Sequence, residues 1–313
     1  MVASAVRVEV ADGVATVYRD NQFVLAYHYG DCERYPYCHP VNLPGGPPVT
    51  LYQPFDHVWH LGMYFAWKYL NGVNVWEGPD SGEAYGGTRP VDLAPVSDEA
   101  VGAGVRHTID WIESDGTPLL RDHRTVLVRA IDSSAYHIID WDFEFTPLQD
   151  VVELDRKVEW GGYAGLGVRL PRSFLAPRML NAEGDRDTAA TSRARSRWTD
   201  YSGWIDGEGH RTRGGVTMID HPSNPRYPTP WLTYDTRDLQ FLNAAFLRDK
   251  PYELRRGETL RLAYRVLVHW GEGDPEVIEA EANMFAATDP LEWAHSVSIG
   301  DLGPTTPWSG RTE

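Results

Sequence analysis

The sequence predicts an all-β fold, a large antiparallel β-sandwich with one C-terminal helix. Apolar and polar residues alternate with a period of two over residues 136–146 and 260–270, which is the pattern of half-buried strands. Near the N-terminus Asp12-Gly13 separates two short alternating runs, and this dipeptide is a strong β-hairpin signal. A helix start appears only late, at Asp274-Pro275.

The N-terminal part begins with strands and then loses regular structure. We expect strands at Val6–Val10 and Val14–Tyr18, on either side of the Asp-Gly turn. Residues 30–60 carry repeated prolines together with Gly45-Gly46. Helices and central strands do not tolerate prolines at that density. We therefore predict a long ordered loop, of the kind that often carries function.

The middle of the chain gives the clearest strands. Thr125–Ile131 and Tyr136–Thr146 flank Asp132-Ser133-Ser134. In the second run His137, Ile139, Trp141, Phe143 and Phe145 are predicted to share one face, with Asp140, Asp142 and Glu144 on the other. Further strands are expected within 151–160, 166–170, 215–219, 239–247 and 260–270. Residues 181–200, rich in Asp, Arg, Ala, Thr and Ser, look like a mobile excursion.

One helix is expected after Asp274-Pro275, because Val277, Ile278, Glu281 and Phe285 follow at helical spacing. The sequence shows no internal repeat and no linker. We therefore expect residues 1–290 to form a single β-sandwich domain and residues 291–313 to form a C-terminal tail. Many strands followed by a late helix are typical of such a sandwich.

Composition excludes some partners. The net charge is −16, with 45 acidic against 29 basic residues. Nucleic-acid binding depends on Lys and Arg neutralising phosphates, so neither nucleic acid nor an anionic membrane surface is expected as a partner. The 12 Trp and 16 Tyr suit flat apolar ligand faces, although wide sheets also bury aromatic residues for packing alone.

The chain reads as a cytoplasmic protein. Met1–Arg7 shows no basic segment followed by a long apolar run, so no signal peptide is expected. No apolar run approaches the length of a membrane span. Cys32 and Cys38 are six positions apart; a disulfide is geometrically conceivable, but reduced thiols are favoured in a chain without a leader.

Three stretches concentrate polar residues in turn-rich settings. The first is Asp56-His57-Val58-Trp59-His60, whose HxxH spacing suits acid–base pairing beside Asp56 or ligation of a divalent metal. Histidines that pack or cap are an equal alternative. The zincin motif HExxH is absent.

The second stretch is residues 220–229, where prolines alternate with His221, Asn224 and Arg226. Prolines restrict the backbone, so these side chains would be presented to a ligand without an ordering cost. A structural crossover that caps backbone groups is the alternative. The third stretch is Glu159-Trp160-Gly161-Gly162-Tyr163, which leads to Arg169; it suits a sugar, or equally a β-bulge with an ion pair.

The chain also resembles the family labelled PmoA-like. The matching motifs are Pro40-Val41-Asn42-Leu43-Pro44-Gly45-Gly46, Asp56-His57 through His60 and Gly62, Asn71-Gly72 with Trp76, Gly165-Leu166-Gly167-Val168-Arg169, Asp200-Tyr201-Ser202-Gly203, residues 220–229, and Arg256-Gly257-Glu258-Thr259-Leu260 up to His269. They cover nearly the whole chain to about residue 287. One motif departs, since the family tends to read DHPHHRG where this chain has DHVWHLG. The loss of the middle histidine weakens a three-histidine metal site.

This resemblance implies a β-supersandwich similar to mutarotase-like carbohydrate enzymes, and association with a sugar dehydrogenase. Methane oxidation, which the family label suggests, is rejected because a membrane oxygenase subunit needs spanning helices. The leading hypothesis is a carbohydrate-active enzyme that acts on a sugar or an oxidised (keto) glycoside by acid–base chemistry. Hydrolysis, β-elimination and epimerisation all remain open. A non-catalytic carbohydrate-binding or sensing module is the alternative, and a structural partner of a dehydrogenase is a third.

The hypothesis assigns a role to each candidate residue. His57 or His60 would move a proton and His221 would be the complementary group, while Arg169 and Arg226 would orient the substrate or stabilise negative charge. The expected substrate contacts are Trp59, Glu159, Tyr201, Asn224 and Trp231. The catalytic candidates should then meet in one cleft. No organic cofactor is expected, and a divalent metal at His57 and His60 is left open.

Overall fold

Antiparallel β-sheets build almost the whole structure, a computed structural model that describes residues 5–30, 34–206, 211–290 and 298–299. One sheet has eight strands, in the spatial order β1-β2-β3-β4-β5-β13-β18-β17. Their bounds are Val6–Ala11, Val14–Arg19, Gln22–His28, Tyr37–Val41, Met63–Ala66, Gly165–Arg169, Gln240–Ala244 and Trp231–Asp235.

A second sheet has nine strands, in the order β14-β15-β16-β20-β11-β10-β9-β8-β21. Their bounds are Leu175–Asn181, Trp198–Asp206, Arg211–Asp220, Leu260–Trp270, Tyr136–Pro147, Pro118–Arg129, Gly102–Glu113, Gly86–Asp98 and Ser298–Ile299. A four-stranded sheet joins β19 (Tyr252–Arg255), β12 (Val151–Asp155), β6 (Tyr69–Leu70) and β7 (Val73–Asn74).

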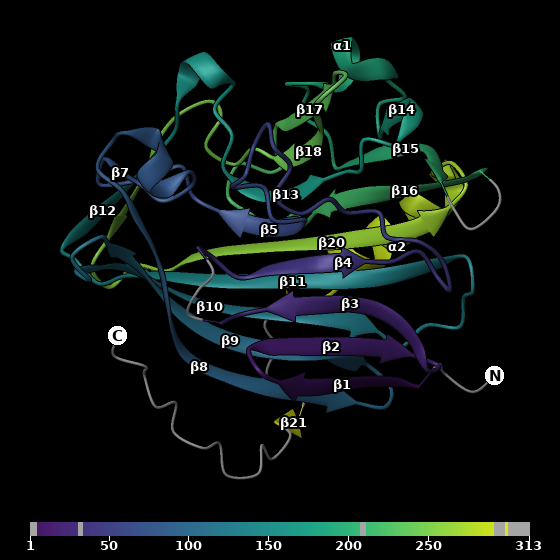
Figure 1. Cartoon of the computed structure of the whole chain (residues 1–313), viewed down its shortest axis with the longest axis horizontal. Coiled ribbons are helices and arrows are strands. Elements are labelled where there is room, and N and C mark those ends of the chain that lie inside the picture. The colour runs from purple at the N-terminus through teal and green to yellow at the C-terminus, as the bar shows by residue number, and fades with distance from the viewer. Residues whose placement is uncertain (1–4, 31–33, 207–210, 291–297, 300–313) are drawn as a thin grey trace.

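The two large sheets pack face to face, as Figure 1 shows. Aromatic residues fill the space between them: the rings of Phe65 on β5 and Phe143 on β11 lie 4.4 Å apart, and those of Trp67 and Phe145 lie 5.0 Å apart. Burial of such large apolar side chains supplies the main stabilisation of a sandwich. The predicted antiparallel β-sandwich is therefore confirmed.

The predicted hairpins are confirmed in detail. β1 pairs with β2 around Asp12-Gly13, with Ala11 opposite Val14. β10 pairs with β11 across the predicted 132–134 turn. The pairing of β11 with β20, which is distant in sequence, was not predicted. Asp140 and Asp142 on the acidic face of β11 are buried, because α2 (Pro275–Ala286) covers the outer face of this sheet, whereas Glu144 is partly exposed. Asp140 is accordingly paired with Arg265 at 2.8 Å.

The late helix begins where the sequence predicts it, since the side chain of Asp274 accepts a hydrogen bond from the backbone N–H of Glu276 at 2.9 Å. The other helical segments are short: η1 (Gly78–Ser81), η2 (Val158–Trp160) and α1 (Asp187–Thr191). The described helices are all too short or too polar to span a lipid bilayer.

Two expectations for loops need correction. Residues 30–60 contain strand β4, which includes Pro40. Proline is tolerated there because the residues of β4 that pair with neighbouring strands are Tyr37, Cys38 and Val41. The missing N–H of Pro40 therefore falls outside the paired positions. Residues 181–200 hold α1 and the start of β15, and local bonds such as Asp185 N–H to Asn181 Oδ1 at 2.8 Å order this segment.

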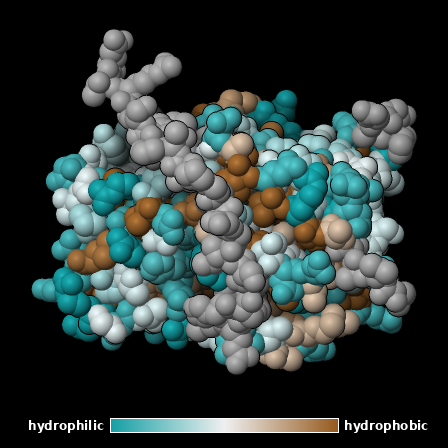
Figure 2. All heavy atoms as spheres, turned by 90° about the horizontal axis from the view of Figure 1, so that it is seen from below, coloured by the Kyte–Doolittle hydropathy of each residue, from teal (hydrophilic) through white to brown (hydrophobic). Residues whose placement is uncertain are grey.

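Two further expectations concern the cysteines and the C-terminal tail. Cys38 is a buried free thiol whose pKa is raised by burial, whereas Cys32 lies outside the described residues. In the tail only β21 is described, and it pairs with β8 through Ile299 and Val96. On the face of the molecule shown in Figure 2, hydrophobic residues lie in small groups among hydrophilic ones.

Candidate functional site

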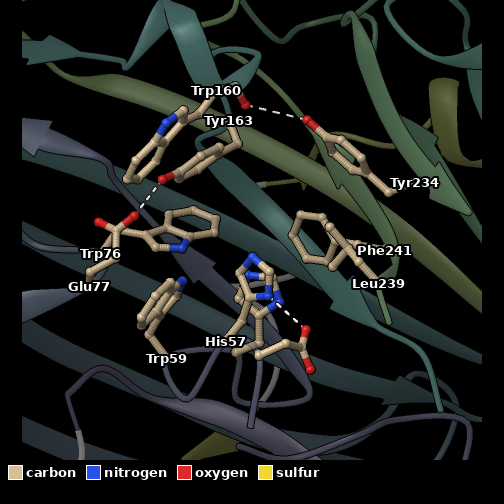
Figure 3. A pocket seen from close by; sticks show the side chains of 11 residues that line it. His57, Trp59, Trp76, Glu77, Trp160, Tyr163, Tyr234, Leu239 and Phe241 are labelled. Atoms are coloured by element: carbon tan, nitrogen blue, oxygen red, sulfur yellow. Dashed lines mark hydrogen bonds and ion pairs between the residues drawn. The ribbon is translucent and has the colours of Figure 1, made fainter. Parts of the chain in front are cut away.

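The candidate site is a cavity of about 380 Å³, which is within the range of about 300–1,000 Å³ that small-molecule sites occupy. Its ring-bearing walls are Trp59, Trp76, Trp160, Tyr163, Tyr234 and Phe241. Leu239 completes the apolar lining, and the ionisable residues are Asp56, His57, His60 and Glu77. Figure 3 shows these side chains gathered around one space.

The histidine pair stands on two consecutive turns and not on a helix. The backbone N–H of His57 donates to Pro54 O at 3.0 Å, and that of His60 donates to His57 O at 2.9 Å. The backbone N–H of Gln53 closes the segment by donating to His60 O at 2.9 Å. This geometry stacks the two imidazole rings 4.7 Å apart.

Asp56 fixes the tautomer of His57. His57 Nδ1 lies 2.7 Å from Asp56 Oδ2, and an ionised carboxylate only accepts, so Nδ1 carries a proton. In the neutral form of the His57 ring, Nε2 is then the acceptor. Burial alone would raise the pKa of Asp56, but hydrogen bonds from His57, Arg169 and Arg172 outweigh burial and hold it far below the usual value. Asp56 therefore stays ionised. His57 retains partial exposure, with 32% of its side chain open to solvent.

His60 is held neutral behind His57. Burial lowers its pKa well below the ordinary value, and the neighbouring His57 and Arg169 lower it further. The Nη1 of Arg169 lies 3.3 Å from His60 Nδ1. Because guanidinium only donates, His60 Nδ1 is the acceptor and Nε2 carries the proton. The site thus pairs one imidazole that accepts at Nε2 with one that donates at Nε2.

Arg169, on β13, lies behind the cavity and does not line it. It is fully buried, and its Nη2 donates to Asp56 Oδ2 at 2.7 Å and also to the carbonyl of Asp238. Desolvation lowers its pKa, which the charge of Asp56 opposes. Arg169 therefore positions Asp56 and His60, and the role in substrate orientation that was expected for it stays a prediction.

A buried ion pair, Lys68 with Glu77, forms another part of the cavity wall through Glu77. Glu77 accepts hydrogen bonds from Lys68 Nζ and from the hydroxyl of Tyr163, and both Lys68 and Glu77 are buried. The Lys68 ammonium also lies 5.3 Å from the centre of the Trp160 ring. Since the Tyr163 proton is committed to Glu77, the lone pairs of its oxygen are what it offers to a ligand.

The residues of the 220–229 loop lie elsewhere. His221 and Asn224 line a different cavity, on the outer face of β11 and β20. His221 Nε2 donates to Phe285 O at 3.1 Å, and Asn224 bonds both Asp220 and the backbone of Ala263. These bonds tie the loop to β20 and α2.

Arg226 is likewise occupied by backbone groups. It donates to the carbonyl oxygens of Phe246, Lys250 and Pro251 at 3.0, 2.7 and 2.6 Å. Its guanidinium also stacks over Phe246, 4.8 Å from the ring centre. The expectation of one cleft shared with His57 is therefore revised: the prolines hold a structural crossover, and the polar side chains serve its backbone.

The other expected substrate contacts divide in the same way. Trp59 lines the cavity. Trp231 is fully buried and donates to Ser196 O at 2.8 Å, and Tyr201 is fully buried and donates to Tyr234 O at 3.1 Å. Both belong to the packed interior. Glu159 is exposed in η2, beside Trp160 but outside the cavity lining.

The sequence did not predict several residues that line the cavity, chiefly Trp76, Glu77 and Phe241. A usable signal precedes the first two: Asn74 Oδ1 accepts from the backbone N–H groups of both Trp76 and Glu77 at 3.1 Å. Asn side chains commonly form turns by bonding the backbone two residues further on. Nothing local marks Phe241, which lies on β18 and stacks on His60 at 4.8 Å.

Metal ligation at the histidine pair stays a prediction. In the part of the chain that the structure describes, no group of three or more His, Cys, Asp or Glu is arranged to hold a metal ion. Both Nδ1 atoms already have partners in Asp56 and Arg169. His57 and His60 could therefore supply only their Nε2 atoms, two nitrogens of the set that a divalent metal needs.

Comparison with known proteins places the chain in a family. The family model described as a family of unknown function, DUF6807, matches residues 15–283. The chain belongs to this family. The description carries no activity, so the PmoA-like resemblance stays a prediction. The sequence matches no curated protein significantly.

Among solved structures the chain is similar to the GH36 α-galactosidases AgaA and AgaB of Geobacillus stearothermophilus, with 10% and 12% identical residues and TM-scores of 0.42 and 0.41. The chain is also similar to the galactosidase domain of the α-galactosidase–sucrose kinase AgaSK, with 9% identical residues and a TM-score of 0.42. The matches cover 86%, 86% and 85% of this chain but 41%, 40% and 42% of those chains. The chain thus spans about two-fifths of their length.

Proposed function

We propose that this protein is a carbohydrate-active enzyme that acts on a sugar or an oxidised (keto) glycoside by acid–base chemistry. The observation that carries the proposal is the Asp56–His57 pair at the edge of an aromatic cavity, with the neutral His60 stacked beside it. A carboxylate that fixes an imidazole tautomer is the usual arrangement of a histidine general base.

The walls of the cavity favour a ligand with apolar ring faces and hydroxyl edges. Trp160 is 50% exposed and Trp59 is partly buried, so both indoles are available for stacking. The indole N–H of Trp76 is buried and has no acceptor among the described residues. Buried donors without a partner are costly. The Tyr163 oxygen would accept from a ligand hydroxyl.

Each group then has a role that its hydrogen bonds permit. His57 Nε2 takes a proton from the substrate, and His60 Nε2–H donates to an oxygen on which negative charge develops. Arg169 and Asp56 hold both rings in place without touching the substrate. Hydrolysis, β-elimination and epimerisation all need such groups, and the choice among them stays open. Association with a sugar dehydrogenase also stays a prediction.

A non-catalytic carbohydrate-binding module is the second candidate, because the aromatic walls alone would bind a sugar. The full chain should be screened by thermal shift against methyl glycosides, disaccharides and their 3-keto forms, since ligand binding raises the melting temperature by mass action. Proton NMR then follows each stabilising compound with time. Stabilisation with conversion supports the enzyme; stabilisation of the protein by a compound that stays intact supports the binding module. No stabilisation by any of these compounds contradicts both.

A further inference from the structure

A second cavity adjoins the first through Trp59. It has a volume of about 300 Å³, and Trp59 is the residue that lines both cavities. The other walls of the second cavity include Gln53, Pro79, Tyr85 and Thr88. The two cavities are therefore neighbours that meet at Trp59.

Contacts hold both the ring and the backbone of Trp59, and the ring lies edge-on to that of His57, with ring centres 5.5 Å apart. The hydroxyl of Tyr35 donates to the Trp59 carbonyl, and Tyr35 is fully buried and stacks on Tyr64 at 5.2 Å. A bridge between Tyr52 and Leu61 closes the base of the turn that carries the tryptophan. A fixed aromatic ring contributes contact area without an ordering cost.

The two cavities differ in chemistry. The first contains Asp56, His57, His60 and Glu77, whereas the residues that the structure describes in the lining of the second include one cation, Arg34, and no Asp, Glu or His. The second instead offers a side-chain amide from Gln53 and a ring from Tyr85, which is 40% exposed. Such groups bind hydroxyls and ring faces but have no group suited to move a proton near neutral pH.

We propose that the second cavity is the subsite for the group attached to the reacting sugar, so that the substrate is a glycoside of two ring units, such as a disaccharide or an aryl glycoside, and not a free monosaccharide. This inference rests on the proposed function. The reacting sugar lies among His57, His60 and Trp160, and the attached ring crosses Trp59 to lie against Tyr85 and Pro79.

Gly87 allows the second cavity to be filled without disturbing the first. It lies on β8, its backbone is not left-handed, and a Cβ there would meet Arg34 O at 3.5 Å, an ordinary contact. Gly87→Leu would therefore place a side chain in the second cavity. Val91→Leu is the matched control, because Val91 lies on the same strand, is 48% exposed and lines neither cavity.

The test compares the affinities of the wild-type chain, Gly87→Leu and Val91→Leu by titration calorimetry. The probes are a methyl glycoside and the disaccharide and p-nitrophenyl glycoside of the same sugar. We expect the two-ring probes to bind the wild type at least about tenfold more tightly than the methyl glycoside, which corresponds to about 1.4 kcal/mol. Gly87→Leu should remove this difference and leave methyl glycoside affinity unchanged, and Val91→Leu should behave as the wild type.

Two results would overturn the inference alone: equal affinity of the wild type for one-ring and two-ring probes, or undiminished two-ring affinity in Gly87→Leu with an unchanged melting temperature. If no probe binds the wild type at all, the proposed function fails together with the inference. The melting temperature of each variant is measured in parallel, so that loss of folding is not read as loss of binding.

Discussion

Arg169 Nη2 and His57 Nδ1 share one acceptor, Asp56 Oδ2, each at 2.7 Å. The buried guanidinium therefore sets the charge and the position of the carboxylate that orients the exposed imidazole. His60 is drawn into the same arrangement through Nη1. One arginine on β13 thus organises three residues of the 54–62 turn, more than a hundred positions earlier in the chain.

The lowered pKa of Asp56 makes part of the stability dependent on pH. A carboxyl whose pKa is lowered on folding contributes stability that is present above its ordinary pKa of 3.8 and is lost as the pH falls towards the folded value. The melting-temperature difference between wild type and Asp56→Asn should therefore be constant from pH 7 to about pH 5 and shrink below pH 4.

Melting curves of both proteins from pH 3 to pH 7 check this expectation. Asp150→Asn is the control, because Asp150 is 91% exposed and its ion-pair partner Arg256 is 61% exposed. Exposed ion pairs contribute little, so this substitution should change the melting curve little. A difference between wild type and Asp56→Asn that persists undiminished to pH 3 would show that the carboxylate is not stabilised by its neighbours.

The buried Lys68–Glu77 pair predicts a non-additive effect of substitution. Glu77→Gln should cost about 3–5 kcal/mol, because removing one partner of a buried pair leaves the other charge uncompensated. The double change Lys68→Met with Glu77→Gln should recover much of that loss, since the unpaired ammonium is gone and the amide oxygen still accepts from Tyr163. Urea unfolding of the two single variants and the double variant measures the coupling free energy between Lys68 and Glu77. Losses of unfolding free energy that simply add would argue against an interaction between them.

Arg226 is expected to act on stability and not on ligand binding. Arg226→Lys loses the planar fork that serves three backbone carbonyls, and carbonyls left unpaired cost about 1–3 kcal/mol each. Arg261→Lys, at a side chain that is 57% exposed with one ion pair to Glu144, is the control and should change little. If Arg226→Lys were as stable as the wild type but bound sugar more weakly, the 220–229 loop would belong to the binding site after all.

Much of the fold was predictable from local pattern. Period two in residues 136–146 and 260–270 predicted β11 and β20, because both strands alternate towards the core between the sheets. The segment 181–200 was not predictable, since its polar residues satisfy their own backbone, as Asn181 and Asp185 do, and such residues look the same as those of an unstructured loop.

The site was predictable only where its residues are neighbours in sequence. Asp56, His57 and His60 could be found from their spacing, whereas Lys68 and Glu77 read as ordinary surface charges until the fold buries them together. Arg226 shows the converse difficulty. A proline-bracketed polar loop presents the same sequence whether its side chains face a ligand or its own backbone, and only the three-dimensional partners separate the two.

Metal dependence has a direct test that needs no substrate. If the Nε2 atoms of His57 and His60 bind a divalent ion, Zn²⁺ should raise the melting temperature of the wild type, and the rise should vanish in His60→Gln and on addition of EDTA. His123→Gln, on β10 and away from the cavity, should keep the response. An equal rise in melting temperature with Zn²⁺ in wild type and His60→Gln would show that the ion does not bind at His57 and His60.

The most direct test of the central claim is His57→Gln, measured for turnover and for binding on a glycoside that the wild type converts. A general base contributes about 10²–10⁴-fold to rate, and glutamine can still donate to Asp56, so kcat should fall by that order while the dissociation constant stays within about threefold of the wild-type value. His123→Gln should match the wild type in both. Turnover that survives in His57→Gln, or binding and turnover lost together in a folded protein, would contradict the assignment of His57 as the base.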